Sequence, residues 1–292
     1  MLLTRVLRCT LSFAFCACVC AQQPPAVDDA ADRALRHANP EWQAIAPHLP
    51  DPETASPTKL AEAADVLRAR RLPEDALDYY RYALKRGGDQ AKLENDIGVT
   101  LLGLQRYPEA LSAFQHALKL KPKDAQFWNN LGAAEYVSGR FRSALEHYQR
   151  AVRLDRKTAV YRANLGTAYF ELKDYERARD QFQHAIKLDP NVFHSGGWAG
   201  VQAHVLSAGD HGRFCFEMAK MSARQRDDES TLRWLARSAE AGFDIAAQMV
   251  EDKDFTLYRK DARVLTIIQN ARALKGKQIA ASGVAPLAAP TQ

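Results

Sequence analysis

The sequence is poor in the features that mark several protein classes. Its 15 glycines and 13 prolines among 292 residues are too few for a collagen-like or proline-rich chain. The net charge of +5 is small and gives no argument for nucleic-acid binding, which requires clustered basic faces. Apolar residues make up 47% of the chain, which excludes disorder throughout. The composition therefore predicts one or two folded domains or a repeat array.

Cysteine is almost absent after the first 20 residues. Cys9, Cys16, Cys18 and Cys20 lie near the N-terminus, and only Cys215 lies beyond them. If the N-terminal segment is removed, no disulfide can form within the chain. Stability then has to come from packing.

The N-terminal segment has the layout of a secretory signal peptide. Arg5 and Arg8 precede an uncharged, mostly apolar run over residues 9–20, and Ala21 is a small residue before the expected cleavage. The run is shorter than the roughly 20 residues of a membrane-spanning helix. We predict a signal peptide over residues 1–21. A buried N-terminal helix and a lipoprotein, with the lipid on a cysteine at the cleavage site, are the alternatives.

Motifs of metal sites and of common catalytic sites are missing from the sequence. No His-x-x-x-His pair occurs, residues 22–292 contain no Cys-x-x-Cys pair, and there is no nucleophile elbow, phosphate-binding loop or dinucleotide fingerprint. His211 and Cys215 are four residues apart and would meet on one helical turn, as a cysteine–histidine nucleophile requires. Because no orienting acid or amide is evident and Cys215 shares an apolar stripe with Met218, we interpret Cys215 as an inert buried thiol. The sequence predicts no catalytic residue, no metal and no cofactor.

What the chain does contain is an internal repeat of 34 residues. Counted from Pro57, the periods are 57–90, 91–124, 125–158 and 159–192. Matching residue types occupy four positions of the period: small residues at the eighth (Ala64, Gly98, Gly132, Gly166), alanine at the twentieth (Ala76, Ala110, Ala144, Ala178), aromatic residues at the twenty-fourth (Tyr80, Phe114, Tyr148, Phe182) and alanine at the twenty-seventh (Ala83, Ala117, Ala151, Ala185).

These positions resemble the tetratricopeptide repeat, most clearly in 125–158 with Trp128, Leu131 and Gly132. The resemblance implies an all-α, right-handed superhelical solenoid with N- and C-terminal capping helices, in which each period forms two antiparallel helices, A and B. Small residues at positions 8 and 20 would let the two helices approach closely. As buried aromatics, Trp128 and Phe182 should each cost about 3–5 kcal/mol when truncated to alanine.

The rest of the chain departs from the period. We predict a leader and N-terminal cap over 22–56 and, where the period breaks, an insertion over 193–211, either an odd helix or loop that bends the solenoid or a loop over the binding face. A degenerate repeat over 212–245 and closing helices over 246–275 follow. Residues 276–292, rich in Gly, Ala, Pro and Ser, are predicted to form a disordered tail.

In the family that the repeat resembles, the A helices line a concave groove through positions 2, 5, 6, 9, 12 and 13. The predicted partner-binding residues at these positions are Lys92, Asn95, Val99, Leu102, Gln126, Asn129, Asn130, Tyr136, Asn164, Thr167, Phe170 and Glu171. Their amides can pair with a peptide backbone, and Tyr136 and Phe170 suit an apolar side chain. A solvated groove without a ligand is the alternative. Most basic residues of a carboxylate clamp are missing, so we do not expect one.

These patterns together predict a non-catalytic scaffold or adaptor of the bacterial cell envelope, in the periplasm or outside the cell. Its expected partner is a protein or peptide docked in the groove, with no nucleic acid and no membrane-spanning segment after the signal peptide. Two other functions are kept. One is an enzyme with a small site around residues 193–215, and the other is a lipid-anchored assembly component.

Overall fold

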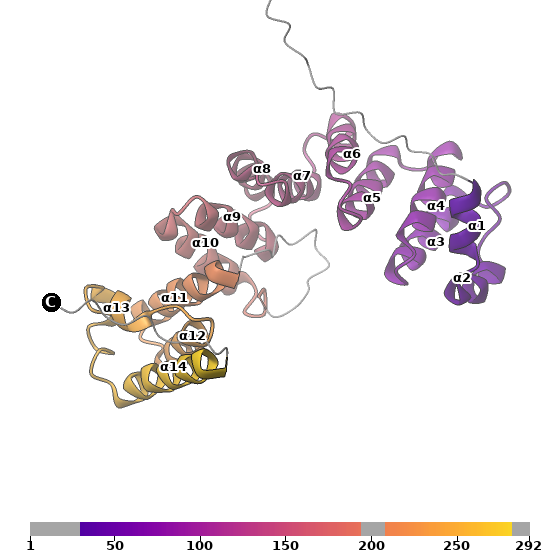
Figure 1. The fold of residues 1–292 in the computed structure, drawn as a ribbon. Helices are drawn as coiled ribbons and strands as arrows, with labels where there is room; N and C mark the ends of the chain where they lie inside the picture. Colours follow the sequence, from indigo (N-terminus) through magenta and orange to yellow (C-terminus); the bar gives the residue numbers. More distant parts are fainter. Residues whose placement is uncertain (1–29, 194–207, 282–292) are drawn as a thin grey trace, which may run out of the picture. The chain divides into compact units, whose positions relative to one another are not determined.

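The computed structural model describes residues 30–193 and 208–281 (Figure 1). The predicted signal peptide, the first residues of the predicted leader, most of the predicted insertion and residues 282–292 lie outside this range. The chain divides into two compact units, Met1–Leu49 and Pro50–Gln292.

In the first unit, the described residues form three short helices. They are α1 (Ala30–His37), α2 (Pro40–Ile45) and the 3-10 helix η1 (Ala46–His48). Asn39 caps α2, because its Oδ1 accepts a hydrogen bond from the Glu41 amide at 2.9 Å. The rings of His37 and Trp42 stack with their centroids 3.9 Å apart.

The second unit consists of consecutive helices, and its described residues contain no strand. The helices are α3 (Pro57–Ala69), α4 (Pro73–Lys85), α5 (Gln90–Gly103), α6 (Tyr107–Leu120), α7 (Ala125–Val137), α8 (Phe141–Leu154), α9 (Ala159–Glu171), α10 (Tyr175–Leu188), α11 (Ala208–Arg224), α12 (Asp228–Glu240), α13 (Ile245–Met249), the 3-10 helix η2 (Lys253–Phe255) and α14 (Ala262–Ala281). Consecutive helices from α3 to α12 pack as hairpins, and each hairpin packs against the next (Figure 1). This confirms the predicted all-α repeat fold.

One backbone device is repeated at the turn inside each of the first four hairpins. Arg71, Gln105, Gly139 and Lys173 all have positive φ angles, of 62°, 60°, 75° and 63°. They are 34 residues apart and therefore occupy position 15 of the period. A left-handed residue at this place ends an A helix and turns the chain into the B helix. Only one copy uses glycine, so the other three hold an L-residue in a conformation that glycine adopts more easily.

In the second, third and fourth hairpins, the glycine at position 8 of helix A faces the aromatic ring at position 24 of helix B. A Cβ atom added to Gly132 would lie 2.8 Å from the Tyr148 ring, and one added to Gly166 would lie 2.5 Å from the ring of Phe182. Both rings are fully buried. The predicted close approach of the two helices thus rests on a glycine that leaves room for a buried aromatic ring.

We expect Gly132→Ala to lower the free energy of unfolding by about 1–3 kcal/mol, because the new methyl group overpacks the Tyr148 ring. Urea denaturation followed by circular dichroism measures this difference. Gly103→Ala is the matched control, since a Cβ at this helical glycine meets no atom within 4 Å. The control should be neutral or slightly stabilising. Equal destabilisation by both variants would contradict the packing argument.

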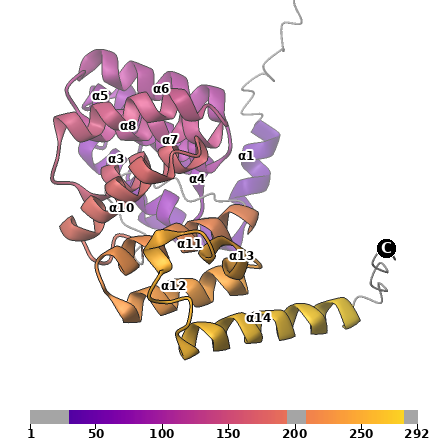
Figure 2. The ribbon, with the colours of Figure 1, turned by 90° about the vertical axis from the view of Figure 1, so that its left-hand side faces the viewer.

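A second core closes the C-terminal end of the unit. Leu235, Phe255 and Val264 are fully buried in a cluster shared by α11, α12, η2 and α14, and α14 lies against α12 (Figure 2). Ion pairs cover this cluster: Lys220 Nζ lies 2.5 Å from Asp252 Oδ2, and Arg224 also pairs with a carboxylate of η2.

Three features differ from the sequence predictions. Helix α11 begins at Ala208, inside the segment predicted as an insertion. Helix α14 continues to Ala281, so the disordered tail predicted from residue 276 starts too early. A single glycine at 276 costs a helix only about 1 kcal/mol, and the alanine, lysine and glutamine around it are good helix formers. Trp128 is only partly buried.

Candidate functional site

The predicted groove residues all lie on three A helices of the array. Helix α5 carries Lys92, Asn95, Val99 and Leu102; α7 carries Gln126, Asn129, Asn130 and Tyr136; and α9 carries Asn164, Thr167, Phe170 and Glu171. The A helices of successive hairpins run beside each other, so equivalent positions lie in rows across them.

Four asparagines of these helices form one continuous row of hydrogen bonds. The Asn164 amide donates to Asn129 Oδ1 at 2.8 Å, and the Asn129 amide donates to Asn130 Oδ1 at 3.4 Å. The Asn130 amide in turn donates to Asn95 Oδ1 at 2.8 Å, and the Asn95 amide donates to Asp96 Oδ1 at 3.2 Å. This amide row joins α5, α7 and α9, and all four asparagines are buried.

The repeat period explains how the row forms. Asn95 and Asn129 occupy position 5 of their periods, and Asn130 and Asn164 occupy position 6. Each bond between helices therefore runs from position 6 of one repeat to position 5 of the repeat before it, 35 residues away. Sequence analysis brought these four residues to one surface but did not predict that they bond to one another.

Carboxylates continue the row towards the first hairpin. Asp65 on α3 accepts hydrogen bonds from the Tyr80 hydroxyl at 2.6 Å and from Arg68 Nη2 at 2.9 Å. Burial raises the pKa of Asp96 above its usual range, and the neighbouring Asp65 carboxylate raises it further. Arg68 and the hydrogen bond from Asn95 act in the opposite direction. The A-helix surface that carries the amide row and this acid pair is called the groove face below.

The sequence prediction missed Asp65 and Arg68. They occupy positions 9 and 12 of the first period, which are groove positions in the resembled family. Applying the same positions to 57–90 would have found them. The prediction left this period out because it drew its groove residues from the following three periods.

Asp96→Asn should raise the free energy of unfolding at pH 7, because it removes a partly buried charge near Asp65. The folded-state pKa of Asp96 lies above the unfolded value, so this carboxyl favours folding when protonated and opposes folding as the pH rises through its folded pKa. The advantage of the variant should therefore disappear as the pH falls below that range. Urea titrations at pH 7 and at pH 3.5 measure the difference. A variant less stable at pH 7 would contradict it.

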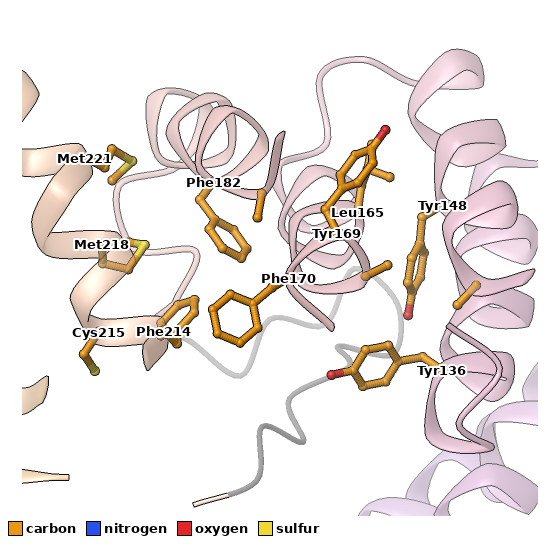
Figure 3. Close-up of a cluster of buried hydrophobic side chains, with 13 residues drawn as sticks. Tyr136, Tyr148, Leu165, Tyr169, Phe170, Phe182, Phe214, Cys215, Met218 and Met221 are labelled. Atoms are coloured by element: carbon orange, nitrogen blue, oxygen red, sulfur yellow. The ribbon is translucent and has the colours of Figure 1, made fainter. Parts of the chain in front are cut away.

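The predicted apolar contacts lie in a core cluster between hairpins (Figure 3). Phe170 is 3% exposed, and its ring centroid is 6.0 Å from that of Phe214 on α11. Tyr136 is also 3% exposed, and its hydroxyl donates to Glu171 Oε1 at 2.8 Å. These rings hold neighbouring hairpins together. Leu102 and Thr167 are buried as well.

The remaining predicted residues form the accessible edge of the groove face. Lys92 and Gln126, both at position 2 of their periods, are exposed, and Val99 and Glu171 are partly buried. The exposed Lys92 and Gln126 can be changed with little effect on folding. These two residues are therefore the best positions for mutations that test the groove face.

Cys215 lies outside this face and is fully buried in the core cluster. Its Sγ is 3.6 Å from His211 Nε2, so the predicted helical-turn contact between the two residues is present. Burial raises the pKa of the thiol to about 11. The reactive thiolate is therefore scarce at neutral pH, in line with the inert-thiol interpretation.

We expect Cys215 to react with a maleimide at pH 8 at least about 100-fold more slowly in the folded protein than in urea, because burial and the raised pKa both suppress the thiolate. Peptide mapping by mass spectrometry separates its labelling from that of the N-terminal cysteines. Rapid modification of Cys215 in the native protein would instead indicate an accessible, activated thiol.

The part of the chain that the structure describes shows neither a metal site nor a membrane-spanning helix. No group of three or more His, Cys, Asp or Glu side chains within residues 30–193 and 208–281 is arranged to hold a metal ion. Across the same residues, every helix is too short or too polar to cross a membrane.

Comparison with known proteins gives one family. Residues 89–157 and 123–191 match the model of the tetratricopeptide repeat. No curated protein is significantly similar to the chain in sequence.

Several solved structures are similar to the chain at low identity. MamA from Desulfovibrio magneticus RS-1 is 19% identical, with a TM-score of 0.46 over 66% of this chain and 97% of that chain. PilF of Pseudomonas aeruginosa is 18% identical, with a TM-score of 0.48 over 84% of this chain and 92% of that chain. YrrB, described as a repeat protein of this family with an unusual peptide-binding site, is 20% identical, with a TM-score of 0.43 over 70% and 93%.

Proposed function

We propose that the chain, whose residues 89–157 and 123–191 match the tetratricopeptide repeat model, is a non-catalytic adaptor that binds a peptide or a partner helix on its groove face. The observation that carries the proposal is the amide row, continued by the acid pair Asp65 and Asp96. The asparagines are buried and bonded to one another, so they hold α5, α7 and α9 in register rather than pairing with a peptide. The more accessible side chains beside them, Lys92, Gln126 and Asp96, are the groups that would meet an extended chain.

The acid pair indicates the charge of the partner. Asp96 is partly buried near the Asp65 carboxylate, an arrangement that costs folding free energy at neutral pH. Perturbed carboxyls of this kind are concentrated at functional sites. A lysine, arginine or free amino group of the partner would lower this cost, so we propose that a basic residue of the bound segment lies at this end of the groove face.

Affinity capture from an extract of the source cells tests the proposal. The groove variant Gln126→Lys places a positive charge at an exposed position of α7, where it would repel a basic segment. The control Gln115→Lys makes the same charge change at an exposed position of the B helix α6. Proteins captured by the wild type and by the control, but lost from the groove variant, would support groove binding. Equal capture by both variants would refute it.

We further propose that the protein acts in the bacterial cell envelope after removal of residues 1–21. The basic n-region and the short apolar run of this segment support export. Mass analysis of the mature N-terminus should give Gln22 as the first residue. A lipid-modified cysteine there would identify the lipid-anchored form, and an uncleaved chain would argue against export.

A further inference from the structure

A cavity of about 210 Å³ lies between α10 and the α11–α12 hairpin. It lies where the 34-residue period breaks after the fourth hairpin. Its walls come from the B helices α10 and α12 and from the second half of α11. The groove face is formed by α3, α5, α7 and α9, so the cavity is a separate site.

The apolar walls of the cavity are fixed by the core behind them. Phe193 and Trp234 line it, together with Ile186 and Met221. The Phe193 ring lies 6.0 Å from the Phe214 ring, and the Trp234 ring packs edge-on against the same Phe214 at 6.2 Å. Phe214 and Met221 belong to the cluster in Figure 3. An apolar group entering the cavity would therefore meet preformed aromatic walls, which keeps the cost of ordering them small.

Positive charge predominates at the cavity. Lys187 and Arg237 line it, and neither has a carboxylate partner among the residues that the structure describes. The Arg237 guanidinium lies 5.1 Å from the centroid of the Trp234 ring. A third lining cation, Arg233, donates to Ser230 Oγ at 3.5 Å and forms a 3.6 Å pair with Glu229 one helical turn away, an exposed pair that contributes little to stability.

One acid lines the cavity, and it is already engaged. Asp227 caps α12, with its Oδ1 accepting a hydrogen bond from the Ser230 amide at 3.0 Å. Hydrogen bonds from the Ser230 side chain and the Ser230 backbone amide hold the pKa of Asp227 below its usual value, so the Asp227 carboxylate stays negative at neutral pH. Three lining cations against one acid leave an excess of positive charge around an apolar pocket.

We propose that this cavity is a second binding site, which takes one large apolar side chain of an acidic segment of a partner protein. The volume lies below the roughly 300–1,000 Å³ of pockets for drug-sized ligands and fits a single anchoring side chain. Carboxylates beside the anchor would pair with Lys187 and Arg237. An anchor in a pocket with charged residues around it is the usual architecture of an interaction hot spot.

Three synthetic tripeptides, blocked at both ends, test the site on the full chain. Acetyl-Glu-Phe-Glu-amide has the anchor and the charge, acetyl-Lys-Phe-Lys-amide reverses the charge, and acetyl-Glu-Ala-Glu-amide lacks the anchor. The NMR resonance of the Trp234 indole N–H, assigned with Trp234→Phe, reports occupancy. Only the first peptide should shift it with saturation. A response to all three, or to none, overturns the proposal.

Two double variants with the same charge change distinguish binding at this cavity from non-specific electrostatic attraction to the protein. Lys187→Glu with Arg237→Glu should weaken binding of acetyl-Glu-Phe-Glu-amide at least 10-fold, because both exposed cations line the cavity. Lys119→Glu with Arg150→Glu makes the same charge change at exposed positions of α6 and α8 and should leave binding unchanged. Equal weakening by both pairs would overturn the proposal. If the affinity-capture test of the groove face fails, the Trp234 NMR titrations still test the cavity, because they do not involve the groove face.

Discussion

Arg179→Ala is expected to lower the free energy of unfolding by about 3–5 kcal/mol, because it leaves a buried carboxylate without its main partner. Arg179 on α10 pairs through Nη1 with Glu217 on α11, and the Arg179 and Glu217 side chains are 9% and 1% exposed. Arg213, 3.1 Å from the other carboxylate oxygen, is the only further cation paired with Glu217 among the described residues. Thermal or urea unfolding followed by circular dichroism measures the loss.

The exposed pair between Lys121 and Asp89 is the control. It joins the N-cap of α5 to the C-terminal end of α6, with 2.7 Å between Nζ and Oδ2, and its side chains are 49% and 51% exposed. Lys121→Ala should cost at most about 1 kcal/mol, because water screens this pair. The double variant Arg179→Met with Glu217→Leu should recover much of the stability lost in Arg179→Ala, since no buried charge remains. If Arg179→Ala costs no more than Lys121→Ala, burial is not what makes the pair important.

This ion pair also shows where sequence reasoning stopped. The period predicted the contacts that repeat, such as Gly132 against Tyr148, because both residues recur in fixed positions of each copy. Arg179 and Glu217 are 38 residues apart, on the two sides of the segment that breaks the period. No other described repeat carries an equivalent pair, so comparing equivalent positions of the period could not predict it. Periodicity predicts the contacts that recur in every repeat, but it cannot predict contacts at the junction between α10 and α11, where the period breaks.

The groove face was also only partly predictable from the sequence. Position in the repeat brought Asn95, Asn129, Asn130 and Asn164 to one surface, and the structure places them in one row. Their partners depend on a one-residue offset between neighbouring A helices, which a list of equivalent positions does not contain. The cavity beside Trp234 was not predictable, since it arises from the packing of α10 against a hairpin outside the regular period.

Phe182→Ala is expected to cost about 3–5 kcal/mol, as predicted from the sequence, because the ring is fully buried and leaves a cavity. The Phe182 ring centroid lies 5.3 Å from that of Phe214 and 5.5 Å from that of Phe193. Truncation thus removes contacts within the fourth hairpin and also between it and α11. Urea denaturation monitored by circular dichroism gives the difference in unfolding free energy.

The same truncation at Trp128 should have a smaller effect, which corrects the sequence-based expectation of equal costs. Trp128 is only partly buried, and its Nε1–H donates to the Pro122 carbonyl at 2.9 Å near the start of α7. Its removal exposes little new surface and leaves a small gap that water can enter, so we expect a loss of about 1–2 kcal/mol. If Trp128→Ala and Phe182→Ala lower the free energy of unfolding equally, the degree of burial does not determine how much each aromatic side chain stabilises the fold.

A double-variant cycle tests whether the Phe182 loss comes from the contact with helix A. Gly166→Ala alone should be destabilising, because its Cβ would lie 2.5 Å from the Phe182 ring. In Phe182→Ala that ring is gone, so the added methyl group fills part of the space it leaves, with the Ala178 carbonyl oxygen at 3.2 Å as its nearest remaining neighbour. The combined variant should therefore be more stable than the sum of the single losses predicts, by about 1–3 kcal/mol. Strict additivity would show that the small-residue position and the aromatic position stabilise the hairpin independently, which the repeat model does not allow.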